Sequence, residues 1–409
     1  MHHGHDTAQR LGAPYAWFIA SGASWYTTWG MQQVIFSWLL VGVLQEDPAR
    51  VGSAQMLMAL PALFLMPLAG SLADRFGRRR VLLVVHVLSA GVAAATAGWL
   101  MSGRLTLGGL LVLAPIWGSL MSVQFPAREA ILFDVAHADL ARGSAGTTLA
   151  QFAFLAVGSA LAALTTQFGT PMVLAGQSLL AALGILPLPK LPGGASTQPS
   201  KSSEAGWGAT LLEGLRTVAS IPKLRLLAIL TVANGLLFLG PYFVAGPIMV
   251  RDVYGGGAGD VGLFFMMFPL GTGLCSAVLV LRGRIENGLA ALIAALGLGA
   301  VCMLAIALEP AFEIVLGIVF VWGCAGGVFI TMGRTLFLEG APASHRARVV
   351  SVQGLALMGS APLSHLLTGL VAEAFGVATA FRGAGLAMLG AVALACLRLR
   401  RDAKTTAAP

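Results

Sequence analysis

Twelve apolar runs divide the sequence, and they constrain its fold more than any other feature. A helix needs roughly 20 consecutive apolar residues to cross the hydrocarbon core of a bilayer. Only 10% of the residues are charged, whereas soluble domains carry about 25%. We therefore expect an all-α membrane protein with twelve transmembrane helices. The runs lie near residues 14–43, 53–73, 81–101, 105–126, 147–168, 172–189, 226–249, 259–281, 288–308, 313–333, 349–372 and 377–397.

Lys and Arg residues are distributed unevenly around these runs. If the N-terminus is cytoplasmic, the outer loops hold only four of the 25 basic residues, namely Arg50, Arg104, Arg251 and Arg382. The opposite orientation would reverse this ratio and break the positive-inside rule. We therefore expect both termini in the cytoplasm. The net charge of +8 follows from this topology, so no nucleic-acid partner is expected.

A polar segment separates the spans into two groups of six. It is rich in Gly, Ser, Pro and Lys, which is typical of a linker, and residues 207–218 within it are expected to form a short interfacial helix. The halves repeat each other weakly, and repeated halves are the plan of one large class of transporters. The predicted divisions are an N-terminal tail 1–13, a first bundle 14–189, a linker 190–225, a second bundle 226–397 and a C-terminal tail 398–409.

Several classes of site are not expected. The four cysteines lie in apolar runs without ligand spacing, so neither a disulfide nor a metal site is predicted. The tail residues His2, His3 and His5 could bind a metal, although a flexible tail also accounts for them. No GxxxxGK[ST] loop for ATP and no Ser-His-Asp arrangement occurs. The chain is therefore predicted to be neither an ATP-driven pump nor an enzyme.

A short charged loop follows the second run, with the sequence Gly-Ser-Leu-Ala-Asp-Arg-Phe-Gly-Arg-Arg-Arg at residues 70–80. It resembles the signature G-x-L-A-D-R-x-G-R-[RK]-x-x-L of the major facilitator superfamily at every position. Residues 29–38, 126–130 and 346–363 resemble one branch of it, the bacterial secretion-type exporters that include the enterobactin exporter. The resemblance implies the major facilitator fold, two pseudo-symmetric six-helix bundles, in a bacterial inner membrane.

This resemblance also implies a gate in the loop. Family members place the acid at position 74 against the start of span 11, where a carboxylate near a helix N-terminus gains about 0.3–1 kcal/mol. Arg78 can pair with an acid at the exit of span 4, and the halves would then be joined on the cytoplasmic side. The alternative is a loop that only sets topology. The predicted gating residues are Gly70, Asp74, Arg75, Gly77, Arg78, Glu129, Asp134, Arg346 and Arg348.

The chemical character of the substrate path is predicted from the absence of charged residues in the middle of several spans. Spans 1, 2, 4, 5, 7 and 9 carry no Asp, Glu, Lys or Arg near their middle, and intramembrane charges commonly mark substrate pathways. We therefore expect a neutral, polar and aromatic cavity. Trp25, Trp29, Gln32 and Phe36 share one helical face, and superfamily members line the cavity with spans 1, 4, 7 and 10. The alternative is helix packing. The predicted cavity residues are Trp25, Tyr26, Trp29, Gln32, Gln33, Phe36, Asn234, Tyr242 and Trp322.

His365 in span 11 is the predicted candidate for proton coupling, because imidazole titrates near neutral pH. A histidine bonded to a neighbouring helix is the alternative. The expected function is secondary active transport of a small amphipathic or neutral solute (a metabolite, siderophore or drug), as proton-coupled export. An uptake permease or a substrate-sensing receptor of the same fold stays open. Expected partners are the substrate and the bilayer. We expect a monomer and no cofactor beyond the proton gradient.

Overall fold

The computed structural model of the protein describes residues 12–137, 139–192, 207–282, 285–342 and 345–406. Within these residues the chain is helical and contains no strand. Eleven segments are long and apolar enough to cross a membrane. The three N-terminal histidines and most of the predicted linker lie outside the described residues, so the predictions made for them stay predictions.

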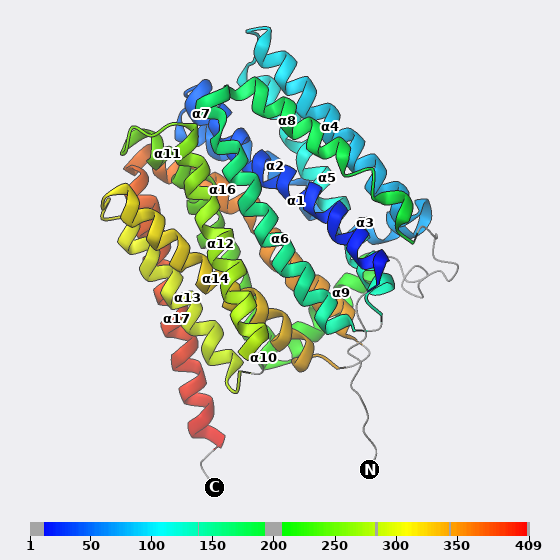
Figure 1. Ribbon diagram of the computed structural model, residues 1–409. Helices are drawn as coiled ribbons and strands as arrows, with labels where there is room; N and C mark the ends of the chain where they lie inside the picture. The colour runs from blue at the N-terminus through cyan, green and yellow to red at the C-terminus, as the bar shows by residue number, and fades with distance from the viewer. Residues whose placement is uncertain (1–11, 138, 193–206, 283–284, 343–344, 407–409) are drawn as a thin grey trace, which may run out of the picture.

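The first half of the chain contributes the helices drawn in blue to green (Figure 1). Its spans are separated by short turns, and Pro61 breaks the second span in two because proline lacks the N–H that would continue the helix. The elements are α1 (Ala13–Trp38), η1 (Leu39–Val43), α2 (Pro48–Ala59), α3 (Pro61–Phe76), α4 (Arg78–Met101), α5 (Leu107–Val135), α6 (Leu140–Ala163), α7 (Thr165–Phe168), α8 (Thr170–Leu183) and η2 (Leu188–Lys190).

The second half begins with a short helix outside the spans, and Pro362 lies where its eleventh span is broken. The elements are α9 (Trp207–Ser220), α10 (Pro222–Gly240), η4 (Pro241–Ala245), α11 (Gly246–Asp252), α12 (Ala258–Arg282), α13 (Gly288–Ile306), α14 (Phe312–Gly340), α15 (Arg346–Met358), α16 (Ala361–Phe375) and α17 (Val377–Thr406). Pairs such as α15 and α16 form one predicted span. The exact boundaries of the two predicted bundles stay a prediction.

The helix α1 is absent from the eleven segments that length and hydropathy identify. It carries Ser, Thr and Gln residues, and these lower its hydropathy. Its polar side chains Thr28, Gln32 and Gln33 are buried against other helices, and α1 packs on α6 and α8 (Figure 1). Polar groups of a membrane helix can find hydrogen-bond partners in this way. The helix α1 therefore corresponds to the first predicted span, which hydropathy alone does not identify.

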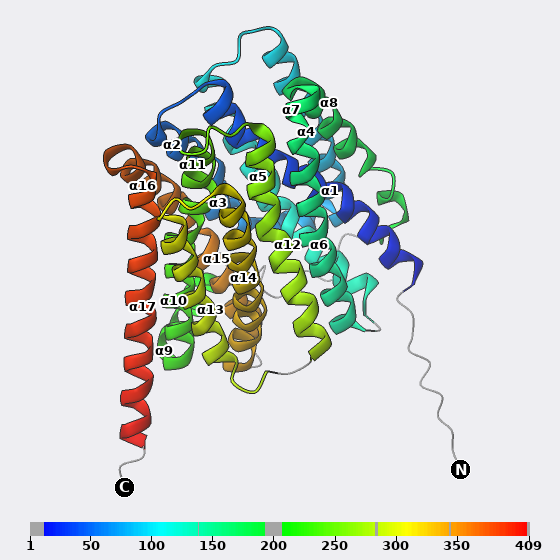
Figure 2. The same ribbon diagram turned by 60° about the vertical axis from the view of Figure 1, so that its left-hand side comes forward.

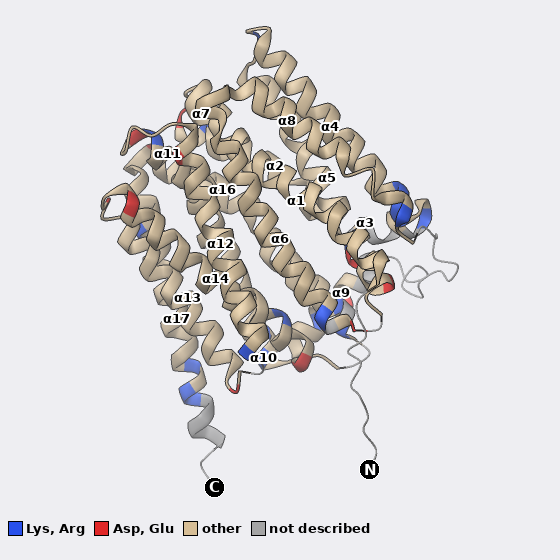
Figure 3. Cartoon of the chain, viewed as in Figure 1, with Lys and Arg blue, Asp and Glu red and all other residues tan. Residues whose placement is uncertain are grey.

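The start of α1 and the end of α17 lie at the same end of the bundle, which we call the proximal end (Figures 1 and 2). We call the opposite end the distal end. Lys and Arg residues gather mainly at the proximal end (Figure 3). Arg50, at the start of α2, and Arg251, at the end of α11, lie in the distal segments instead. This distribution is the one that the sequence predicts.

Two helix pairs make the largest contacts between the halves. The helices α6 and α12 run side by side through the middle of the bundle (Figures 1 and 2), and α2 packs on α16. Small residues permit this close approach, as is common between membrane helices. An added Cβ at Gly52 would lie 2.9 Å from the Cα of Gly369, and one at Gly262 would lie 2.9 Å from the Cα of Ala163. The two halves therefore meet backbone against backbone.

Candidate transport pathway and gates

The charged loop forms a tight turn between α3 and α4. Gly77 has a φ of 86°, in the left-handed region that glycine adopts without a steric penalty. The predicted turn at Gly77 is thus present. The surroundings of Gly70 and the carboxylate of Asp74 lie outside the described part of the chain, so their gating role stays a prediction. The guanidinium of Arg75 lies 5.5 Å from the centre of the Phe76 ring.

Arg78 binds the end of α5. Its Nη1 donates to Asp134 Oδ2 at 2.6 Å and to the carbonyl of Ala130 at 3.2 Å. Asp134 is therefore the partner among the two predicted acids. This ion pair joins α4 to α5 within one half, so the prediction that it connects the two halves is wrong. Arg78 pairs within its own half because α4 begins next to the point where α5 ends.

The second predicted acid, Glu129, makes a contact between the halves. Its Oε2 lies 3.4 Å from Nη2 of Arg334 on α14, and the two side chains are 29% and 48% exposed. Exposed ion pairs of this kind contribute roughly 0–1 kcal/mol. The contact between the halves at the proximal end thus involves Arg334, which the sequence suggested only through the weak repeat of the fourth span in the tenth.

We predict that reversing either charge of this pair changes the balance between conformations and lowers transport. Glu129→Arg and Arg334→Glu should each reduce the transport rate by about fivefold, since the pair is worth up to about 1 kcal/mol. The double variant restores an ion pair and should recover most of the rate. Initial rates in proteoliposomes check this. A double variant as slow as the slower single variant would contradict it.

One of the two predicted gating residues of α15, Arg348, contacts the linker helix α9. Arg348 Nη1 donates to Glu213 Oε1 of α9 at 2.5 Å, and His345 Nε2 lies 3.0 Å from the same oxygen. Arg346 is exposed at the first position of α15. Arg348 therefore connects the start of α15 to α9.

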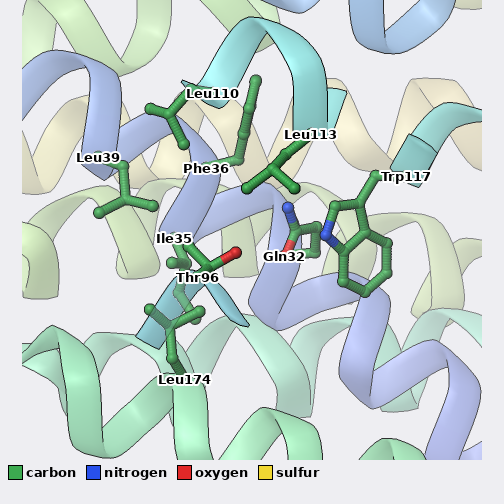
Figure 4. A pocket seen from close by; sticks show the side chains of 9 residues that line it. All are labelled: Gln32, Ile35, Phe36, Leu39, Thr96, Leu110, Leu113, Trp117 and Leu174. Carbon is green, nitrogen blue, oxygen red and sulfur yellow. The ribbon is translucent and has the colours of Figure 1, made fainter. Parts of the chain in front are cut away.

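The α1 face predicted to line the cavity points into the first half of the chain. Gln177 Nε2 on α8 donates to Gln32 Oε1 at 2.9 Å and to the carbonyl of Thr28 at 3.2 Å. Figure 4 shows Gln32 and Phe36 among side chains of α4, α5 and α8. These contacts match the alternative of helix packing, and a role of Gln32 and Phe36 in a substrate cavity stays a prediction. The buried amide of Gln32 needs a partner, and α8 supplies it.

Three of the remaining α1 candidates are packed against side chains of the first half. Trp25 is buried, with its ring 6.0 Å from that of His86 in an edge-to-face contact, and its role in a cavity stays a prediction. Tyr26 is buried in the same cluster, and Trp29 packs against it partly buried. Gln33 is buried as well.

The candidates in the second half form an aromatic cluster. The rings of Tyr242 and Trp322 lie 5.9 Å apart in an edge-to-face contact, and Phe238 contacts Trp322 at 5.6 Å. The Tyr242 hydroxyl donates to the carbonyl of Phe265 at 3.1 Å. The structure thus brings Tyr242 and Trp322 together in a buried cluster, and their role in a substrate cavity stays a prediction. Asn234 is partly buried, one turn before Phe238.

His365 lies where α16 meets α2. Its Nδ1 donates to the carbonyl of Gln55 at 3.1 Å, and its ring contacts that of Phe243. The hydrogen bond to a neighbouring helix, which the sequence left as the alternative, is therefore present. Its Nε2 is buried without a hydrogen-bond partner among the described residues. Proton coupling through His365 stays a prediction.

The contact of α2 with α16 forms what we call the distal seam. Gln55 Nε2 donates to Ser37 Oγ at 3.0 Å, and the N–H of Ala49 donates to Glu373 Oε2 at 2.8 Å. Glu373 thereby caps the positive end of α2 from the opposite half. The residues that define the seam are Ala49, Gly52, Gln55, His365, Gly369 and Glu373. The sequence alone did not predict that α2 and α16 pack against each other through these residues.

Arg128 is a buried cation that the sequence prediction missed. Only 3% of it is exposed, its Nη2 donates to the carbonyl of Phe18 at 2.9 Å, and its guanidinium lies 4.6 Å from the Phe18 ring and 5.5 Å from that of Tyr26. No carboxylate of the described residues forms an ion pair with it. The expected span ended at residue 126, whereas α5 continues to Val135. Arg128 lies near the proximal end of α5, and the residues from Leu107 to Ala127 carry no charge, so the expectation of an uncharged middle of span 4 is not contradicted.

Residues 18–360 match the family model of the Major Facilitator Superfamily. The chain belongs to the major facilitator superfamily. It is 30% identical over 391 residues to the multidrug efflux pump Tap of Mycolicibacterium fortuitum, covering 91% of this chain and 92% of that protein. It is 28% identical over 392 residues to Tap of Mycobacterium tuberculosis, covering 91% and 90%. A solved structure of the nucleoside transporter NupG superposes with a TM-score of 0.71 at 15% identity, covering 94% of this chain and 99% of that one.

These similarities confirm the predicted superfamily and the predicted fold. The protein is a multi-pass membrane transporter and not an enzyme. The likeness to NupG concerns the fold alone, because the sequences are only 15% identical. The predicted membership in the branch of secretion-type exporters that includes the enterobactin exporter stays a prediction.

Proposed function

We propose that this transporter exports a small amphipathic or neutral compound across a bacterial inner membrane, driven by the proton gradient. Alternating access requires two halves that close at one end while the other end opens. The distal seam carries the proposal, because there α2 and α16 pack backbone against backbone across the halves. The similarity to Tap, a multidrug efflux pump, favours export of such compounds.

The orientation follows from charge. The proximal end gathers most Lys and Arg residues (Figure 3), and the positive-inside rule places such an end in the cytoplasm. Both termini are then cytoplasmic, and the distal seam closes the outer side. The structure in this orientation corresponds to a state closed to the outside.

Proton coupling needs an ionisable group that both halves can sense. His365 is our candidate, because it lies on α16 and bonds to α2 of the other half. Its buried Nε2 has no partner among the described residues, so a proton could be taken up there when the seam opens. A monomer is sufficient for this cycle, with the substrate and the bilayer as partners.

Transport in cells and in proteoliposomes tests the proposal. Purified protein is first screened for amphipathic and neutral compounds that raise its melting temperature, which a bound ligand does by mass action. Cells that express the transporter should then accumulate several-fold less of a stabilising compound than cells with an empty vector. Collapse of the pH gradient should remove the difference.

The alternative functions give different results in the same assays. Higher accumulation in expressing cells would indicate an uptake permease and would overturn export. A stabilising compound that shows no flux in proteoliposomes under an imposed pH gradient would indicate a receptor. His365→Ala that still expels the compound under the gradient would exclude His365 as the proton carrier while leaving export intact.

A further inference from the structure

The linker helix α9 lies at the proximal end, packed on α15 and α10 (Figure 1). Its inner side is closely fitted to α15. An added Cβ at Gly214 would lie 3.1 Å from both the carbonyl oxygen of Arg348 and Cγ2 of Val352, and Val218 is 4% exposed. Gly214 and Val218 lie one turn apart, so this side of α9 is fixed against the second half of the transporter.

An apolar strip on another side of α9 is not covered by the described part of the chain. Leu212 and Leu215 are 48% and 43% exposed, and Ala219, one turn after Leu215, is exposed too. Residues three and four apart share one side of a helix. Arg216, also exposed, borders the strip on the side away from the packed face. A strip of this kind on a helix with a cation at its edge is typical of helices that lie in a membrane interface.

The neighbouring helix α10 shows where the bilayer surface lies. Arg225, Ile229 and Val232 share one face of α10, at i, i+4 and i+7, and all three are exposed. Ile229 and Val232 belong to a membrane-spanning segment, so this face contacts lipid. Arg225 stands on the same face one turn nearer the proximal end, and we infer that its guanidinium reaches the headgroups. Since α9 ends at Ser220, its uncovered strip lies close to the level of the headgroups.

We propose that α9 is an interfacial anchor that binds the anionic surface of the bilayer. The strip of Leu212, Leu215 and Ala219 enters the boundary between headgroups and acyl chains, and Arg216 and Arg225 bind anionic headgroups. Apolar insertion combined with attraction of basic residues to acidic lipids is sufficient for such binding. The placement at the inner leaflet rests on the orientation given under the proposed function.

The anchor connects to the transport cycle through Glu213. This residue points away from the strip and holds both Arg348 and His345 at the start of α15. The helix α15 is the proximal part of the span whose distal part, α16, forms the distal seam. Lipid bound to α9 therefore fixes the proximal end of that span, and transport is expected to be faster in membranes that contain anionic lipid.

Hydrogen exchange of the full-length protein in nanodiscs tests the anchor without any substrate. The discs contain phosphatidylcholine alone or a mixture with phosphatidylglycerol. We expect amides of residues 211–220 to exchange at least tenfold more slowly in the mixed discs. Leu215→Gln and Arg216→Gln should each remove most of this difference. Arg400→Gln, which removes an exposed cation of α17 at the same end, is the matched control and should keep it.

The outcomes are distinct. Equal exchange of residues 211–220 in the two kinds of disc, or a full lipid effect in both α9 variants, would overturn the anchor. Exchange in α14 reports whether each variant is folded, and Arg216→Gln removes only an exposed charge. Because the assay needs no transported compound, it stands even if the proposed export activity proves wrong.

Discussion

Gly52→Leu is expected to reduce transport at least tenfold, because it prevents the distal seam from closing. An added Cβ at this position would lie 2.7 Å from the carbonyl oxygen of His365 and 2.9 Å from the Cα of Gly369. Both are main-chain atoms, so neither can move aside as a flexible side chain would. Alternating access requires the seam to close once per cycle, and a transporter held open at the distal end cannot complete it.

The matched control for this variant is Gly176→Leu. Gly176 lies in α8, and an added Cβ there meets nothing within 4 Å, so transport should stay close to that of the wild type. In Gly52→Leu, amides of α2 and α16 should also exchange faster, because the two helices are pushed apart. Wild-type transport by Gly52→Leu would show that closure of α2 on α16 is not required, and the proposed role of the seam would be wrong.

The sequence predicted much of the fold and the local part of the site. Hydropathy located the spans, and the positions of Lys and Arg predicted the charge difference between the two ends. The pair of Arg78 with Asp134 and the turn at Gly77 were also predictable, since both depend on residues close to helix ends. Such features follow from local rules of length, charge and backbone conformation.

The rest could not be predicted because it depends on how helices are rotated against one another. Periodicity placed Gln32 and Phe36 on one face of α1, but it does not tell which neighbour that face meets. The hydrogen bond from Gln177 decides this. The pairing of His365 with Gln55 depends likewise on the approach of α2 to α16. Arg128 was missed because an apolar window ends at the first charge, even where the helix continues.

Arg128→Met is expected to reduce transport at least tenfold while leaving the melting temperature unchanged or higher. A buried ion without an acidic partner pays a desolvation cost, so an apolar side chain of similar length is often as stable or more so. The carbonyl of Phe18 also accepts the helix hydrogen bond within α1. The buried Ser21 Oγ, to which Arg128 Nη1 donates at 3.4 Å, keeps His86 Nε2 as a partner at 3.5 Å, so no polar group is stranded. A charge that costs stability inside a membrane is a functional group by default.

The location of Arg128 gives this expectation its physical basis. The guanidinium joins α5 to α1 through the Phe18 carbonyl and the rings of Phe18 and Tyr26, and the next residue, Glu129, contacts Arg334 of the other half. The cation is thus adjacent in the chain to Glu129, whose ion pair with Arg334 connects the halves at the proximal end. Arg128→Lys keeps the charge but loses the planar group that lies on the rings, so intermediate transport is expected.

Arg382→Met is the matched control, because Arg382 also donates to a main-chain carbonyl, that of Ala307, but is exposed. It should transport at nearly the wild-type rate. Thermal unfolding and initial transport rates of the three variants separate the possible roles of Arg128. A large fall in melting temperature of Arg128→Met would show that the cation holds α1 to α5 structurally. An unchanged transport rate would show that the buried charge has no part in the cycle.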